Sequence, residues 1–293
     1  MNPRPRVSVI ITTYNRATLL MEAVNSVLAQ RFQDHEIVVA DDGSTDDTPE
    51  RVRSLQGSIR YVRFAHSGRP EVVRNRALAL TRGDLIAFLD DDDLWHQDKL
   101  ASQVEVLEQA EVGFVYSNVQ ALRPDGSLSA PLLSPRQQQS QNVFDELLTG
   151  CFVHPSTVLI RRDLLEQLGF FDEQFYSQGD YDLWLRAAYL ARAACAPTPL
   201  VYIRQYTDGL SQKRDLLHYQ NAIRVIEHLG QTLPLTLSQR LRSRGGLARL
   251  YAHVGIALLA AGQVQQARHH LLDSVRLNPL QRRPWHALIT SYR

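Results

Sequence analysis

Strand and helix patterns alternate over residues 7–118, and this alternation limits the fold more than any other feature of the sequence. Residues 7–11 form a run of mostly β-branched residues, typical of a strand buried on both faces. Apolar residues then recur at helical spacing between Leu19 and Leu28. The same alternation predicts strands at residues 36–40, 59–64, 84–89 and 112–116, and helices at 71–80 and 97–109. Repeated β-α-β units predict an α/β fold with a mostly parallel, Rossmann-like sheet flanked by helices.

The pattern becomes less regular after residue 118 and is entirely helical from Asp215 onward. The intermediate segment predicts a turn at 124–126, a strand at 156–160, a helix at 182–193 and a last strand at 200–204. We therefore expect one domain at 1–212, with halves 1–118 and 119–212, and a small all-α extension at 213–293.

Part of the extension matches a helical-hairpin repeat of 34 residues, the tetratricopeptide pattern. Tyr251, Gly255, Gly262, Ala267, Leu271 and Pro279 occupy its positions, and Trp285 follows Tyr251 by 34 residues. One and a half units cannot build a solenoid. The match therefore indicates either an incidental helical hairpin or true kinship with the repeat.

The composition excludes several classes of protein. With 44% hydrophobic and 22% charged residues, the chain is neither disordered nor fibrous. No window approaches the roughly 18 to 20 apolar residues that span a bilayer, and residues 1–6 lack a signal-peptide layout. Cys151 and Cys195 cannot form a disulfide framework and lack metal-site spacing. We expect a cytoplasmic protein.

Positive charge is concentrated near the C-terminal end. The chain holds 32 Lys and Arg against 31 Asp and Glu, whereas residues 236–293 hold nine arginines and one acid, Asp273. This tail predicts either peripheral contact with anionic lipids on the inner face of the membrane or pairing with the acidic remainder of the chain, in cis or across a homodimer. No aromatic and basic platform accompanies the charge, so nucleic acid is not an expected partner.

Polar clusters follow the predicted strands at the edge where open α/β sheets bind ligands. They are residues 12–16, residues 41–44, Arg74 with Asn75, and residues 90–93. The last cluster is four consecutive aspartates, which repel one another unless a cation or strong donors compensate. Mg²⁺ or Mn²⁺ takes such oxygen ligands together with phosphate oxygens. The alternative is a solvated acidic turn.

Four ordered motifs resemble family 2 glycosyltransferases, which have the GT-A fold. The motifs are VSVIITTYNR, EIVVADDGSTDDT, RNRAL…GDLIAFLDDDDLW and GDYDLWLR, and the resemblance covers roughly residues 5–205. It implies a nucleotide-binding half at 1–118 and an acceptor-binding half at 119–212. The implied activity is transfer of a sugar from a nucleotide-diphosphate sugar to a hydroxyl acceptor, such as a cell-envelope or lipid-linked glycan in polysaccharide biosynthesis.

The resemblance assigns the nucleobase pocket to three residues. Thr12 and Tyr14 match residues that line it, with Tyr14 stacking on the base. Asp42 matches the acid that hydrogen-bonds the base, typically uracil, and a carboxylate can accept from the ring N–H. This favours a UDP-linked donor and leaves dTDP and GDP open. The alternatives are a strand-end cap for Tyr14 and a turn former for Asp42.

The diphosphate and metal positions are assigned in the same way. Arg74 matches a diphosphate contact, the alternative being a surface charge on a helix. In the D-x-D signature, Asp90 faces the ribose, Asp92 holds the divalent metal, Mn²⁺ or Mg²⁺, and Asp91 fills the variable place beside the nucleotide.

Asp180 matches the family's general base, which takes the proton of the acceptor hydroxyl during inverting displacement. Gly179 stands where relatives usually carry Glu, so the pattern departs from the family at the second acid. The alternative is that Asp180 or Asp182 caps helix 182–193.

Two residues match the acceptor side. Trp95 follows the acidic run, and we expect it to form the floor of the acceptor site. The alternative is that Trp95 packs in the core. His154 lies before a predicted strand, where relatives place acceptor-side residues, and its alternative is a structural histidine.

Two other functions compete with sugar transfer. A nucleotidyltransferase on a similar fold predicts a glycine-rich, basic phosphate loop, which residues 10–16 lack. A non-catalytic nucleotide-sugar binder acting through its helical tail predicts a broken acid set, yet Asp42, Asp92 and Asp180 are all present.

Overall fold

The computed structural model describes residues 4–55, 59–109, 111–140, 142–205 and 211–292. They form two compact units. The first consists of Met1–Val143, Phe152–Glu173 and Arg186–Thr207, and the second of Phe144–Cys151, Gln174–Leu185 and Asp208–Arg293. Two short internal segments thus belong to the same unit as the C-terminal helices.

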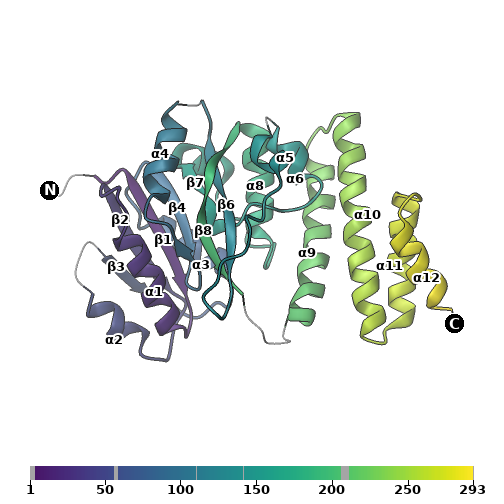
Figure 1. Ribbon diagram of the computed structural model, residues 1–293, viewed down its shortest axis with the longest axis horizontal. Helices are drawn as coiled ribbons and strands as arrows, with labels where there is room; N and C mark the ends of the chain where they lie inside the picture. Colours follow the sequence, from purple (N-terminus) through teal and green to yellow (C-terminus); the bar gives the residue numbers. More distant parts are fainter. Residues whose placement is uncertain (1–3, 56–58, 110, 141, 206–210, 293) are drawn as a thin grey trace. The chain divides into compact units, whose positions relative to one another are not determined.

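An eight-stranded mixed sheet forms the first unit, with strand order β3-β2-β1-β4-β7-β6-β8-β5 (Figure 1). The strands are β1 (Val7–Thr13), β2 (His35–Asp41), β3 (Ile59–Arg63), β4 (Leu85–Asp90), β5 (Leu94–Trp95), β6 (Phe114–Leu122), β7 (Leu159–Arg161) and β8 (Ala193–Arg204). The pairs β1–β2, β1–β4 and β2–β3 are parallel, as the β-α-β alternation predicts. Their carboxyl ends therefore lie at one edge of the sheet.

Helices cover this parallel region on two faces. They include α1 (Ala17–Leu28), α2 (Thr48–Arg53), α3 (Pro70–Leu78) and α4 (Lys99–Gln109). Elsewhere on the sheet, α5 (Pro135–Gln139) contacts β8 and α7 (Arg162–Leu168) contacts β7. Val7, Val9 and Ile11 of β1 share one buried cluster with apolar residues of α1, α2 and α4. Successive strand residues point to opposite faces, and α3 packs on β1 and β2 outside this cluster.

Two predicted strands of the later part of the sheet differ clearly from the structure. The strand expected at 156–160 begins as a 3-10 turn, Pro155–Thr157, and only Leu159–Arg161 form β7. Strand β8 begins at Ala193, well before the expected 200–204. The sequence pattern does not predict the start of this strand, because proline cannot donate a hydrogen bond to a β-ladder and is rare in strands. Pro199 lies at a register shift against β6.

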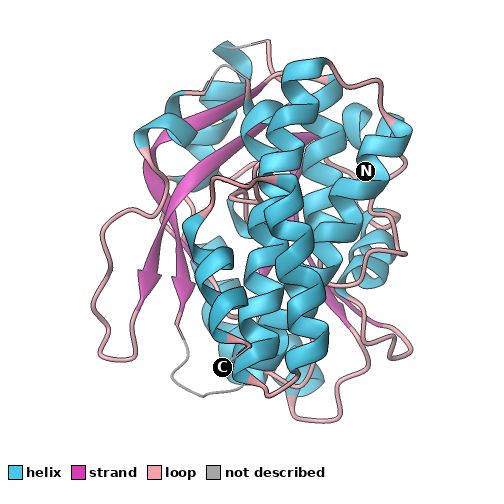
Figure 2. Cartoon of the chain, turned by 90° about the vertical axis from the view of Figure 1, so that its right-hand side faces the viewer, coloured by secondary structure: helices cyan, strands magenta, loops and turns pink. Residues whose placement is uncertain are grey.

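Helices dominate the second unit. They are α6 (Val143–Leu147) and the first part of α8 (Gly179–Leu190), then α9 (Ser211–Thr232), α10 (Leu237–Ala260), α11 (Val264–Leu277) and α12 (Arg282–Thr290). The last four lie side by side (Figure 2). A Cβ at Gly255 of α10 would lie 2.6 Å from Leu271 of α11, so glycine permits close packing of this hairpin. The expected helical extension is confirmed. Within the described residues, no helix meets the length and apolarity needed to cross a membrane.

Candidate functional site

Parallel pairing brings the ends of β1, β2 and β4 together. Thr13 lies opposite Asp41 of β2, and Thr12 lies opposite Asp90 of β4. The loop after each strand therefore begins beside its neighbour, which is why residues from distant parts of the sequence converge here.

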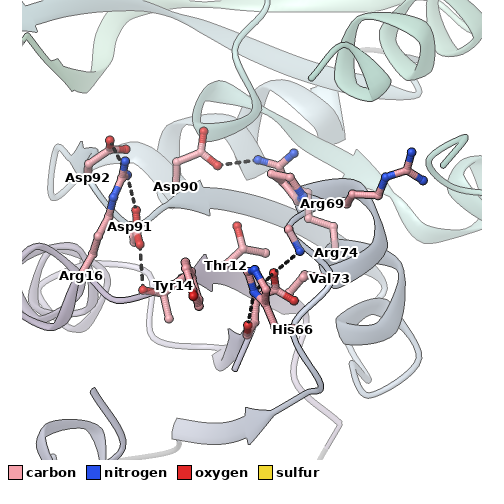
Figure 3. Close-up of a pocket in the computed structure, with 14 residues that line it drawn as sticks. Thr12, Tyr14, Arg16, His66, Arg69, Val73, Arg74, Asp90, Asp91 and Asp92 are labelled. Carbon is pink, nitrogen blue, oxygen red and sulfur yellow. Dashed lines mark hydrogen bonds and ion pairs between the residues drawn. The ribbon is translucent and has the colours of Figure 1, made fainter. Parts of the chain in front are cut away.

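A pocket of about 420 Å³ opens at this edge (Figure 3). All seven residues expected around the nucleotide and metal line it: Thr12, Tyr14, Asp42, Arg74, Asp90, Asp91 and Asp92. Arg16, which belongs to the polar cluster 12–16 but was assigned no role from the sequence, also lines it. The sequence did not single out His66 and Arg69, which line it as well. The predicted donor-side cluster thus exists as one cavity within the first unit.

The loop after β1 is held to the loop after β2 by Asn15. Its backbone has a φ of 52°, in the left-handed region that asparagine tolerates better than most residues. The Asn15 amide N–H donates to Ser44 Oγ at 2.8 Å, and its side-chain oxygen accepts from the Thr45 N–H at 2.7 Å. These bonds orient Tyr14, the preceding residue, at the mouth of the pocket.

Asp42 anchors a second wall of the pocket. One of its carboxylate oxygens accepts from the N–H and the hydroxyl of Ser67, at 2.8 and 2.9 Å, and the other accepts from the N–H of Gly68 at 2.8 Å. His66 Nδ1 lies 2.8 Å from the Asp42 main-chain oxygen. The His66 ring stacks on Tyr14, with centroids 4.2 Å apart. Asp42 therefore places the loop that forms this aromatic pair.

Two arginines pair with three of the four consecutive aspartates (Figure 3). The Arg16 guanidinium lies 3.1 Å from Asp91 and 2.9 Å from Asp92, contacting a carboxylate oxygen of each. Arg74 pairs with Asp90 at 2.5 Å. Arg74 is buried, with its guanidinium 5.6 Å from the ring centroid of Phe171, so the alternative of a surface charge is wrong.

Burial separates two of the four aspartates from water. Asp91 and Asp93 are each 5% exposed, which rules out a solvated acidic turn. Burial raises the pKa of Asp91 to about 6, although Arg16 and a hydrogen bond from Thr13 oppose this shift. Burial and the charge of Asp90 raise the pKa of Asp93, which accepts from Ser156 Oγ at 2.6 Å.

A divalent cation fits the carboxylates at this edge of the sheet if a bound substrate supplies further oxygen ligands. The described residues include no group of three or more His, Cys, Asp or Glu arranged to hold a metal. Asp91 and Asp92 nevertheless share one positively charged partner, Arg16. Mg²⁺ commonly binds through one or two carboxylates plus substrate phosphates and water, and these carboxylates suit that mode.

Neither residue expected on the acceptor side lines the 420 Å³ pocket. Trp95 is buried in the core, where its indole N–H donates to the Ser156 carbonyl at 2.9 Å and Lys99 Nζ lies 3.7 Å from its ring centroid. His154 is exposed just before the 3-10 turn, and its carbonyl accepts from the Thr157 N–H at 3.0 Å. The acceptor role of both residues stays a prediction.

Asp180 belongs to the second unit. Helix α8 begins at Gly179, so both Asp180 and Asp182 lie inside its first turn, and the expected cap of a helix at 182–193 is wrong. Asp180 is half-buried, and one carboxylate oxygen accepts from the Tyr181 N–H at 2.8 Å. The Tyr181 hydroxyl donates to the Leu147 carbonyl at 2.6 Å, which fixes this turn within the unit.

Residues 8–169 match the protein family described as Glycosyl transferase family 2. Over 180 residues the chain is 31% identical to the Escherichia coli UDP-Glc:alpha-D-GlcNAc-diphosphoundecaprenol beta-1,3-glucosyltransferase WfgD, covering 61% of this chain and 68% of that one. An uncharacterized glycosyltransferase of Rickettsia felis is 34% identical over 62% of this chain, which spans only 30% of that protein.

Solved structures share the fold at low sequence identity. The mannosyltransferase PcManGT from Pyrobaculum calidifontis, in complex with GDP-Man and Mn²⁺, has a TM-score of 0.67 at 22% identity, covering 99% of this chain and 80% of that one. S. aureus TarS 1-349 in complex with UDP has a TM-score of 0.60 at 19% identity, covering 98% and 89%. The expected GT-A fold with a helical extension is confirmed. The chain belongs to glycosyltransferase family 2.

Proposed function

We propose that this chain is an inverting, metal-dependent glycosyltransferase that uses a UDP-linked sugar. The convergence of Tyr14, Asp42, Arg74 and Asp92 on one pocket carries the proposal, because an aromatic ring, a carboxylate, a guanidinium and an acidic edge suit the parts of a nucleotide-diphosphate sugar. The relative WfgD is named for UDP-Glc, and TarS binds UDP, which supports the choice of base.

The aromatic end of the pocket would take the base. Tyr14 is 41% exposed although it stacks on His66, so its ring retains accessible area for a base. Asp42 already accepts from Ser67 and Gly68. To accept a hydrogen bond from the uracil N–H, Asp42 would therefore have to use a carboxylate oxygen that also accepts from Ser67 or Gly68.

The arginines would hold the diphosphate. Arg74 is paired with Asp90, and Arg16 with Asp91 and Asp92, so each guanidinium can exchange a carboxylate for phosphate oxygens when the donor enters. Asp90 would then be released toward the ribose. Asp92 would hold the metal, which when bound would stabilise the negative charge of the departing diphosphate.

Asp180 would act as the general base toward the acceptor hydroxyl. A carboxylate in a half-buried helical turn can accept this proton, and its removal typically costs about 10² to 10⁴ in rate. Direct attack on the anomeric carbon gives inversion. We propose a cell-envelope or lipid-linked glycan as acceptor, since WfgD is named for a diphosphoundecaprenol-linked sugar, and a cytoplasmic site of action.

Calorimetry tests the donor site. UDP, dTDP, GDP and CMP are titrated into the protein with and without Mn²⁺, and into Asp92→Ala and the control Asp47→Ala, whose exposed carboxylate pairs with Arg51. We expect UDP binding that requires Mn²⁺ and Asp92 and is unchanged in the control. A preference for GDP or dTDP would overturn the assignment of the base, and absence of all nucleotide binding would refute the transferase.

Anomeric NMR of the product tests the mechanism. Inversion at the anomeric carbon, together with loss of kcat but unchanged UDP affinity in Asp180→Asn, supports the proposed base. A product of retained configuration, or an unchanged kcat in that variant, contradicts it.

A further inference from the structure

The second unit uses most of its arginines internally. Arg242 pairs with Asp145 at 3.5 Å, and Arg276 pairs with Asp273 at 3.3 Å. Four others donate to oxygens of the same unit: Arg240 to Leu235, Arg244 to Leu277, Arg249 to Thr149 and Arg268 to Ser291. Six arginines of residues 236–293 are thus engaged in structural contacts, of which two, at Arg242 and Arg276, are ion pairs.

Two arginines of residues 236–293 without such contacts lie on α12. Arg282 and Arg283 are exposed, and within the described residues neither forms a hydrogen bond or an ion pair through its side chain. Both line a groove of about 620 Å³ between α10 and α12, with His253, His286 and Ile256 among the other lining residues. The α10–α12 groove has no acidic residue in its lining. It is a basic surface without an internal counter-charge.

The charges of two arginines act on a histidine that lines this groove. Burial lowers the pKa of His253, and the nearby charges of Arg283 and Arg249 lower it further. An anion entering the groove would therefore meet two unpaired guanidinium groups, the groups best suited to phosphate oxygens.

Apolar side chains lie beside the basic ones on the same helix. Trp285 is 42% exposed and Ile289 is 58% exposed, at a spacing of one helical turn. The Trp285 indole N–H donates to the Pro279 carbonyl at 2.9 Å, which fixes the ring at the surface. Basic residues next to an exposed tryptophan and an aliphatic residue favour a membrane interface, where arginine meets headgroups and tryptophan lies at their level.

We propose that the α10–α12 groove binds the phosphate headgroups of an anionic membrane through Arg282 and Arg283, with Trp285 and Ile289 entering the interface. This surface is formed by the second unit alone and does not depend on the donor pocket. Its occupant is a lipid bilayer rather than a free phosphate, because the exposed apolar side chains gain nothing from a soluble anion.

Vesicle flotation of the full chain tests this proposal. Phosphatidylcholine vesicles with and without phosphatidylglycerol are compared for the wild type and for the double variant Arg282→Gln, Arg283→Gln. Each arginine near an anionic surface changes partitioning by about fivefold, so we expect the double variant to bind about 25-fold more weakly. Arg51→Gln with Arg53→Gln is the matched control, because it removes the same charge from exposed arginines of the first unit.

Two further variants separate charge from packing. Arg282→Lys with Arg283→Lys should retain most binding, since a membrane surface attracts either cation, and Ile289→Ser should weaken binding with no change in net charge. Circular dichroism verifies that every variant keeps its helices.

Four outcomes would overturn the proposal: no wild-type binding to anionic vesicles, equal losses in the groove and control variants, competition by inorganic phosphate at constant ionic strength, or a dimer in sedimentation that the groove variant dissociates. Calorimetric UDP binding is measured in parallel. It should be unchanged in the groove variants, so failure of the membrane proposal is distinguishable from failure of the proposed transferase.

Discussion

Replacing Asp42 with asparagine tests whether one carboxylate holds the pocket wall. In the structure it accepts from the Ser67 N–H, the Ser67 hydroxyl and the Gly68 N–H at 2.8, 2.9 and 2.8 Å. Asparagine offers a single acceptor oxygen. At least one of the two main-chain N–H groups would then face an amide NH₂, and the remaining bonds would lose their ionic character.

The expected magnitude follows from these bonds. A hydrogen bond to a charged group contributes about 1.5–3 kcal/mol and a neutral one about 0.5–1.5 kcal/mol. Ser67 is half-buried and Gly68 is exposed, so water recovers part of the loss. We expect about 1–2 kcal/mol of local destabilisation, which corresponds to about 5- to 30-fold faster amide exchange in the loop.

Hydrogen exchange of the Ser67 and Gly68 amides measures this effect directly. The control is Asp47→Asn, which removes an exposed carboxylate from the neighbouring helix start. Exchange rates at both amides that stay within about twofold of the wild type would refute the reasoning, because the loop would then be held by other contacts.

Three further substitutions test packing and electrostatics. Gly83→Ala places a Cβ 2.6 Å from a backbone nitrogen of β1, so it should destabilise the fold by about 1–3 kcal/mol in urea, and an unchanged midpoint would contradict the close approach. Gly255→Val would collide with Leu271 and should destabilise the helical hairpin by about 1–3 kcal/mol. The effect should appear as faster amide hydrogen exchange in α10 and α11 but not in the sheet. Burial alone would raise the pKa of Glu36, but hydrogen bonds and the charge of Arg82 lower it overall, so its carboxylate stabilises the fold above the unfolded-state pKa. Glu36→Gln should therefore be less stable than the wild type at pH 7, and the difference should close below about pH 4; a constant difference across this range would exclude the ionic contribution.

The elements of the sheet were predictable because strand and helix periods are local properties of the sequence. Residues 7–11 are mostly β-branched and residues 85–89 are a continuous apolar run, and they became β1 and β4, buried on both faces. The β8 start at Ala193 was missed, since its prolines read as a loop and only pairing with β6 makes a strand of it.

The membership of the donor pocket was also largely predictable. Parallel strands bring their carboxyl ends to one edge, so polar residues after β1, β2 and β4 had to meet there. His66 carried no such signal, because it lies beyond the end of β3 in an irregular loop. It reaches Tyr14 only because Asp42 holds that loop.

The amino-acid order alone determined the α/β alternation, the acidic edge and the surplus of arginine near the C-terminal end, all of which depend on residue type and local spacing. Tertiary structure decided which charges pair. Arg16 meets Asp92 across 76 positions, and Arg242 pairs with Asp145, whereas Arg282 and Arg283 have no such partner among the described residues. The physical reason is that an ion pair depends on distance in space. Spacing along the chain does not contain that distance until the sheet and the helical hairpin have formed.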